Sequence, residues 1–191
     1  MKRTIFFLTS AFASAFIILS CADTTQGIQK ESISKDSMIK RGAYLVNIAG
    51  CGDCHSPKVI TAMGPVPDTT KLFSGHRAES ESNEISTDAF AKGWMLFNGE
   101  NTSLATPGFI SYAANITSDS TGIGLWSFQQ FKTAMTKGKW KGLENGRDLL
   151  PPMPWMNYKE MSKEDLQAIF AYLQSTKPIK NVVPAPVWVK N

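Results

Sequence analysis

Three stretches of the chain place apolar residues at the three- and four-residue intervals of an amphipathic helix. The first runs from about residue 36 to 49 and is followed by Gly50, a residue type that commonly ends helices. Its apolar face consists of Ile39, Ala43, Leu45 and Val46. The sequence therefore predicts a helix that delivers the chain directly to Cys51.

The second predicted helix follows Ser127, which has Gln130 three residues later in the pattern of a capping box. It should end near Gly138. Its inward residues are expected to be Phe128, Phe131, Ala134 and Met135.

The third predicted helix follows Ser162, where Met161 and Leu166 can pack around the cap as a hydrophobic staple. It should end by Lys177, because Pro178 follows. Its inward residues are expected to be Leu166, Ile169, Phe170 and Leu173.

Residues 57–114 are rich in Gly, Pro, Ser, Thr and Asn and show no helical repeat. Four aromatic residues give this stretch enough apolar surface to pack down: Trp94, Phe97, Phe109 and Tyr112. The chain has 191 residues, 42% of them hydrophobic, which suits a single globular domain. We therefore expect one all-α domain over residues 36–178, in which 57–114 is a long irregular insertion that covers one face of a bound group.

The first 20 residues have the order of an export signal, with Lys2 and Arg3, an apolar run over 5–19, and Ser20. As a membrane-spanning helix the run is marginal, because it is shorter than the roughly 20 apolar residues required. It also contains the polar residues Thr9, Ser10 and Ser14.

Cys21 follows directly, and residues 18–21 resemble a bacterial lipobox, in which the cysteine is acylated. An ordinary signal peptide or an uncleaved anchor are the alternatives. The polar residues of 21–35 predict a flexible lipidated tether. Acyl chains on Cys21 would hold the domain at a membrane surface, so we expect it on the periplasmic face of a bacterial membrane.

Charge and motifs argue against two broad functions. The formal net charge is +4 and the basic residues are spread along the chain, so nucleic acid is not an expected partner. No paired carboxylates, Ser-His-Asp set or phosphate-binding loop stands out, and Gly122 and Gly124 lack the third glycine of a dinucleotide motif. We therefore expect no catalytic residues.

Cys51, Cys54 and His55 form a C-x-x-C-H pattern, which is typical of c-type haem attachment. The two thiols can form thioethers with the vinyl groups on one porphyrin edge, and the imidazole can bind the iron. A disulfide, a thioredoxin-like pair and half of a zinc site share the C-x-x-C spacing. However, no βαβ pattern surrounds it, and zinc needs four ligands. The single motif predicts one covalent haem c.

The ligand opposite His55 decides the chemistry. A methionine thioether favours ferrous iron and raises the reduction potential, which suits an electron carrier. Met153 is the best candidate, because prolines precede and follow it and stiffen the backbone. Met156 and His76 are the alternatives, although we expect His76 in a surface loop.

The order of these features resembles a class I c-type cytochrome over roughly residues 36–178. The resemblance implies that the first and last helices cross closely, with Gly42 and Tyr44 meeting Phe170 and Tyr172. Four strings resemble the cytochrome c modules of membrane-bound alcohol and aldehyde dehydrogenases: RGAYLV at 41–46, NIT at 115–117, TGIGLW at 121–126 and LPPMPW at 150–155.

The resemblance also bears on the site residues. The family has its methionine ligand in a P-x-M-P context, which Met153 matches. Trp126 would donate its indole N–H to a haem propionate, as in some family members, or would be a buried core aromatic. Arg147, just before the loop 150–155 that contains Met153 (the methionine loop), would neutralise a propionate. The dehydrogenase subunits often carry several such modules, whereas this chain carries one.

The sequence therefore predicts an electron carrier whose redox partners are a dehydrogenase or a terminal oxidase. A haem enzyme or gas sensor with an open or displaceable sixth position is the alternative. The apolar, proline-containing tail 179–191 is expected to form a strap over its own domain, with docking on a partner as the alternative.

Overall fold

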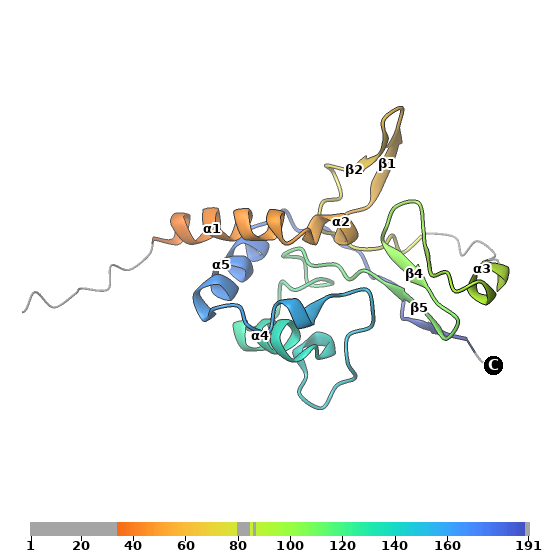
Figure 1. Ribbon diagram of the computed structural model, residues 1–191. Helices are drawn as coiled ribbons and strands as arrows, with labels where there is room; N and C mark the ends of the chain where they lie inside the picture. The colour runs from red at the N-terminus through yellow and green to blue at the C-terminus, as the bar shows by residue number, and fades with distance from the viewer. Residues whose placement is uncertain (1–33, 80–84, 86, 190–191) are drawn as a thin grey trace, which may run out of the picture. The chain divides into compact units, whose positions relative to one another are not determined.

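The structure is a computed structural model that describes residues 34–79, 85 and 87–189 (Figure 1). The predicted export signal over 1–20 and the predicted lipidation of Cys21 lie outside these residues. So does nearly all of the predicted tether over 21–35.

Three helices form where the apolar spacing predicts them. They are α1 (Lys35–Ile48), α4 (Phe128–Lys137) and α5 (Lys163–Gln174). None of the described helices combines the length and apolar character that a membrane crossing requires.

The predicted helix caps are confirmed at α4 and α5. Ser127 and Gln130 make both hydrogen bonds of the capping box at the start of α4. The hydroxyl of Ser162 accepts a hydrogen bond of 3.0 Å from the backbone N–H of Asp165 at the start of α5. Because these signals are local, they specify the helix starts without help from the rest of the fold.

Gly50 separates α1 from a one-turn helix, α2 (Cys51–His55). Its φ of 66° lies in the left-handed region, which glycine adopts at little cost. The other short helices of the described chain are α3 (Thr87–Ala91), η1 (Trp140–Gly142) and η2 (Trp155–Asn157).

The core forms where α1 crosses α5 (Figure 1). At Gly42 a Cβ atom would overlap the carbonyl oxygen of Ala168 and would lie 2.7 Å from the Cβ of Tyr172. The close approach of the two helices therefore requires glycine at this position. The buried residues around the crossing are Leu45, Val46, Ile123, Phe131, Met135, Leu166, Ala168, Ile169 and Leu173.

The expected partners at this crossing are only partly right. Tyr172 does lie against Gly42, but Tyr44 is exposed. Phe170 instead packs against α4, with its ring centroid 5.2 Å from that of Phe131. Phe170 therefore joins α5 to α4.

The expectation of an all-α fold is wrong. Within the described residues, two antiparallel sheets accompany the five α-helices. One is a hairpin of β1 (Lys58–Thr61) and β2 (Gly64–Pro67). The other has the strand order β3-β4-β5-β6, formed by Leu96–Phe97, Ser103–Ala105, Phe109–Tyr112 and Val187–Trp188.

Five of the six strands in the described chain lie in 57–114, so this stretch is not an irregular insertion. The physical reason for the error is strand length. Strands of two to four residues offer too few alternations for a period of two to be visible. The aromatic residues are also only partly packed, because Phe109 and Tyr112 are half-buried whereas Trp94 and Phe97 are exposed.

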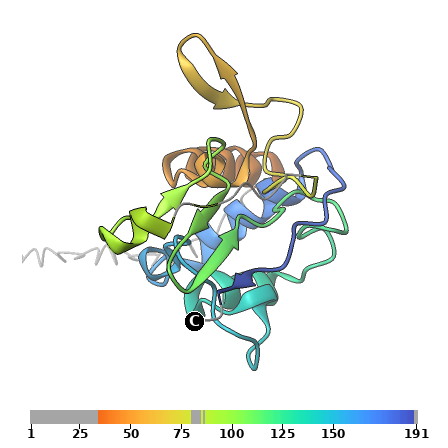
Figure 2. The same cartoon turned by 90° about the vertical axis from the view of Figure 1, so that its right-hand side faces the viewer.

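The chain after Pro178 returns across the domain and adds β6 to the edge of the larger sheet, next to β5 (Figure 2). Phe109 pairs with Trp188 in this register, and their rings meet edge to face at 5.8 Å. Earlier in the tail, before β6, the side-chain amide of Asn181 donates to the carbonyl oxygens of Ser74 and His76, at 2.7 and 2.8 Å. The tail thus fixes the loop before the sheet.

The crossing of α1 and α5 can be tested at Gly42. We expect Gly42→Ala to lower the free energy of unfolding by about 1–3 kcal/mol or more, because the added methyl group meets backbone that cannot move aside. Urea denaturation of the full chain measures this. Gly108→Ala is the matched control, since a Cβ at Gly108 would meet nothing within 4 Å. Equal stability of both variants would contradict the proposed packing.

Candidate functional site

The C-x-x-C-H pattern occupies the single turn of α2. Cys51 and Cys54 are half-buried free thiols. Burial raises the pKa of Cys51 to about 11 and also raises the pKa of Cys54, so both are protonated near neutral pH. Reactive cysteine pairs and zinc sites depend on thiolates, which this environment disfavours. In the part of the chain that the structure describes, no group of three or more His, Cys, Asp or Glu residues is placed to hold a metal ion.

A backbone hydrogen bond fixes the imidazole of His55. Its Nδ1 lies 2.7 Å from the carbonyl oxygen of Ala114. Because a carbonyl oxygen only accepts hydrogen bonds, Nδ1 carries the proton and Nε2 keeps its lone pair. Burial lowers the pKa of His55, which favours the neutral ring. His55 is thus prepared to bind a metal through Nε2, with its ring orientation set by Ala114.

Met153 lies on a loop that is hydrogen-bonded to β5, a few residues before Ala114. The hydroxyl of Ser111, in β5, donates a hydrogen bond of 2.6 Å to the carbonyl oxygen of Pro151. Met153 is half-buried and packs against the core cluster, as does Cys51. Residues 111–114 therefore hold the His55 ring at one end and the Met153 loop at the other.

A second contact joins the methionine loop to the start of the motif. The hydroxyl of Tyr158, directly after η2, donates to the carbonyl oxygen of Ala49 at 3.2 Å. Burial raises the pKa of Tyr158, and the nearby Cys51 and Cys54 raise it further. The chain after Met153 thus returns to the residues that directly precede α2.

The other candidate ligands and contacts are placed differently. Met156, the alternative to Met153, is 58% exposed. Trp126 is half-buried and packs against the core cluster. Arg147 is exposed, donates to the carbonyl oxygen of Asp148 at 2.9 Å, and lies over the ring of Trp140 at 4.8 Å.

The prediction that His76 lies in a surface loop is wrong. His76 is 4% exposed, and its Nδ1 lies 2.8 Å from the hydroxyl of Thr102. Its ring packs on that of Tyr112, with centroids 4.6 Å apart. Both neighbours lie on strands or turns of the sheet that the sequence did not reveal, so a polar partner for a buried His76 was not foreseen.

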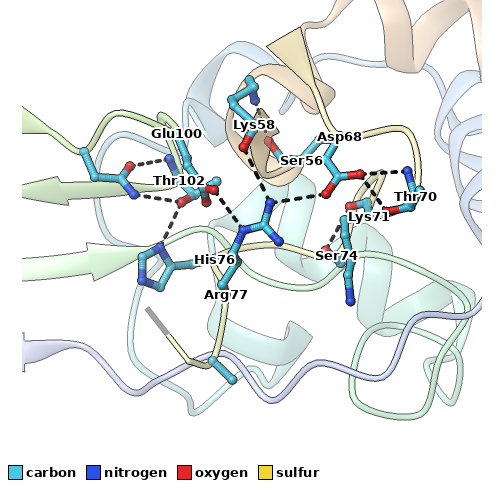
Figure 3. A network of polar contacts seen from close by, with 12 residues as sticks. Ser56, Lys58, Asp68, Thr70, Lys71, Ser74, His76, Arg77, Glu100 and Thr102 are labelled. Carbon is cyan, nitrogen blue, oxygen red and sulfur yellow. Dashed lines mark hydrogen bonds and ion pairs between the residues drawn. The ribbon is translucent and has the colours of Figure 1, made fainter. Parts of the chain in front are cut away.

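Next to His76, Arg77 is the centre of a network of polar contacts (Figure 3). Its Nε donates to Glu100 at 2.8 Å, and its Nη2 lies 3.3 Å from a carboxylate oxygen of Asp68. The same Nη2 is 3.5 Å from the carbonyl oxygen of Lys58. The network ties the base of the β1–β2 hairpin to the turn between β3 and β4.

Sequence reasoning missed several groups that support α2. The ammonium of Lys58 donates to the carbonyl oxygens of Gly52, Asp53 and Ser56, at 3.3, 2.9 and 2.5 Å. A cation just after a helix C-terminus is a recognisable signal, so Lys58 could have been found. Ala114 acts through its backbone carbonyl, for which no residue type is diagnostic.

Asn101, in the turn between β3 and β4, is a further missed contact. Its side-chain amide donates to the carbonyl oxygen of Asp53 at 3.0 Å and lies 3.7 Å from the sulfur of Cys54. Its φ of 58° is a left-handed conformation that asparagine tolerates better than most residues. The turn between β3 and β4 therefore lies against α2 at Asp53 and Cys54.

The donor set fits a c-type haem. It consists of two uncharged thiols on one helical turn, a neutral imidazole with a free Nε2, and a thioether on a loop fixed to the same strand. The raised pKa values of the thiols disfavour a thiolate metal site, and the half-buried setting suits an apolar porphyrin.

The role of Lys58 can be tested by Lys58→Met, which keeps the aliphatic stem and removes the ammonium. We expect the free energy of unfolding to fall by about 1–2 kcal/mol, because three carbonyl oxygens at the end of α2 lose their donor. Thermal unfolding measures the loss. Lys92→Met, at an exposed lysine, should change stability little. A loss of the same size in both variants would show that the carbonyl contacts contribute nothing.

No protein-family model matches this chain. A nicotinate dehydrogenase subunit from Pseudomonas putida is 38% identical over 89 residues, which are 46% of this chain and 7% of that protein. The cytochrome c subunit of gluconate 2-dehydrogenase from Pantoea cypripedii is 31% identical over 140 residues, 73% of this chain and 23% of that subunit.

The cytochrome subunit of fructose dehydrogenase from Gluconobacter japonicus is 31% identical over 150 residues, 78% of this chain and 23% of that subunit. The chain thus spans less than a quarter of the length of these three relatives. The resemblance predicted from the sequence is confirmed: at modest identity over most of the chain, its homologues are cytochrome c subunits of quinone alcohol, gluconate and fructose dehydrogenases.

Proposed function

We propose that the chain is an electron-transfer protein that carries one electron on a single haem c. In this proposal Cys51 and Cys54 hold the haem through thioethers, and His55 and Met153 are the axial ligands. The cytochrome c subunits among its homologues support electron transfer as the general function. The observation that carries the specific site is the double attachment of residues 111–114, through Ala114 to His55 and through Ser111 to the methionine loop.

Each residue has a defined task. The two thiols would hold the cofactor to α2 through thioether bonds. The carbonyl of Ala114 keeps the proton on Nδ1 of His55, which leaves Nε2 free to bind the iron. The soft thioether of Met153 favours ferrous iron and raises the potential. When bound, haem supplies a one-electron iron couple.

The surroundings support this assignment. The hydrogen bond between Ser111 and Pro151 restricts the methionine loop before the ligand, and the contact of Tyr158 with Ala49 restricts it afterwards. The loop is thus held on both sides of Met153, so the thioether would be presented to the iron in a fixed position. Trp126 and Arg147 are assigned to the haem propionates as part of the proposal.

We further propose that the chain works beside a dehydrogenase, from which it accepts electrons, and passes them to a terminal oxidase or another acceptor. The names of the homologous subunits support a dehydrogenase partner. The export signal and lipid-modified Cys21 predicted from the sequence would place the domain on the periplasmic face of a membrane.

The ligand assignment is tested by the visible spectrum of the ferric protein. We expect wild type to show the sulfur-to-iron band of histidine and methionine ligation. Met153→Ala should lose this band, and Met156→Ala, which changes an exposed methionine of the same loop, should keep it. High-spin iron in wild type would contradict the carrier and favour a haem enzyme or gas sensor. A low-spin spectrum that survives both substitutions would contradict ligation by Met153, and its loss in His76→Ala would then identify His76 as the ligand.

A further inference from the structure

The β1–β2 hairpin projects from the domain as a free two-stranded arm in both views (Figures 1 and 2). Residues 59–67 contain no charged side chain. Four apolar side chains are exposed along the arm: Val59 by 45%, Ile60 by 74%, Met63 by 94% and Val66 by 38%. An uncharged, exposed apolar element of this kind usually marks an interaction site.

Both faces of the arm are uncovered. Val59 pairs with Val66, and Ile60 pairs with Pro65, so the two pairs lie on opposite faces of the hairpin. A two-stranded hairpin with no core behind it is only marginally stable in water. Burial therefore benefits this arm on both sides, as happens when it enters a groove.

The arm is nevertheless firmly attached to the candidate haem site. Lys58, its first residue, binds three carbonyl oxygens in and after α2 through its ammonium. The backbone N–H of Asp68 closes the base by donating to the carbonyl oxygen of Pro57 at 2.8 Å. At the tip, the hydroxyl of Thr61 donates to the carbonyl oxygen of Gly64 at 2.7 Å. A protein that holds the arm is thereby held beside His55.

We propose that the β1–β2 hairpin is the docking element for a redox-partner protein and inserts into an uncharged, apolar groove on that partner. The inference rests on the proposed electron-transfer function and names the contact through which the partner is brought to the haem.

A second copy of this chain fits the arm less well. Pro65 and Pro67 lack N–H groups, so the edge formed by β2 cannot pair fully with another strand. Side-chain contact between two arms would involve only a few residues from each copy. A stable interface buries roughly 800 Å² from each partner, which a contact of this size does not reach.

A membrane surface also fits less well. Elements that lie in the lipid interface carry Lys or Arg around an apolar surface and anchor through Trp or Tyr. Residues 59–67 contain none of these four residue types. The lack of charge instead suits the interior of a protein interface, where charged residues are depleted and an unpaired charge is costly.

The partner can be identified by photo-crosslinking in cells that make the protein natively. The full-length chain carries a photoreactive amino acid at position 63, and a control chain carries it at position 95. Met95 is also an exposed methionine, at 60% against 94% for Met63, but it lies outside the hairpin. We expect position 63 alone to crosslink to a subunit of an oxidoreductase, through residues that line an apolar groove. Crosslinks only to a second copy or to lipid, or the same products from both positions, would overturn the proposal.

The affinity for the captured subunit is then measured with purified, haem-loaded full-length protein. The double variant Ile60→Ser/Met63→Ser should bind roughly a hundredfold more weakly, the factor expected for the loss of two buried apolar side chains. The control Met95→Ser/Val182→Ser removes two other exposed apolar side chains and should bind as wild type does. Unchanged binding by the hairpin variant would overturn the docking role. High-spin iron in the wild-type protein would instead count against the proposed electron-transfer function.

Discussion

The hydrogen bond from Nδ1 of His55 to the carbonyl oxygen of Ala114 is the contact on which the arrangement of the site depends. It selects the tautomer of the imidazole and leaves Nε2 free to bind a metal. Because Ala114 lies two residues after the end of β5, the position of His55 is coupled to the register of the sheet. Ser111, in the same strand, holds the loop that presents Met153. One short segment thus sets the relation between two groups almost a hundred residues apart in the chain.

The helices and the larger sheet have different structural roles. α1 and α5 cross closely at Gly42 and supply the core against which both Cys51 and Met153 pack. The strands within 57–114 add little to that core, but they position the acceptor for His55 and the turn that covers Cys54. The tail completes this second part, since β6 pairs with β5 and Asn181 binds the loop around His76. The hairpin is the exception, because it is attached only at its base, to α2 through Lys58 and to the β3–β4 turn through Arg77.

The helices were predictable from the sequence because their signals are local. Ser127, Ser162 and Gly50 act within one turn of the residues they cap, and the apolar spacing repeats several times in each helix. The strands were not predictable, because β3 and β6 have two residues each and β6 finds its partner from the far end of the chain. The motif indicated Cys51, Cys54 and His55 as the candidate site. The contact of Ala114 could not be predicted, because every residue type has the same backbone carbonyl.

The proposed site requires one haem that is covalently attached through Cys51 and Cys54, and the mass of the denatured protein reports this attachment. The full-length chain is produced in an export-competent bacterial host, purified, and extracted with acidified organic solvent before intact-mass measurement. We expect wild type to keep the added mass of one haem and Cys51→Ala/Cys54→Ala to keep none. A wild-type protein that gives up its haem to the solvent, or that carries a disulfide between Cys51 and Cys54, would contradict the proposed attachment.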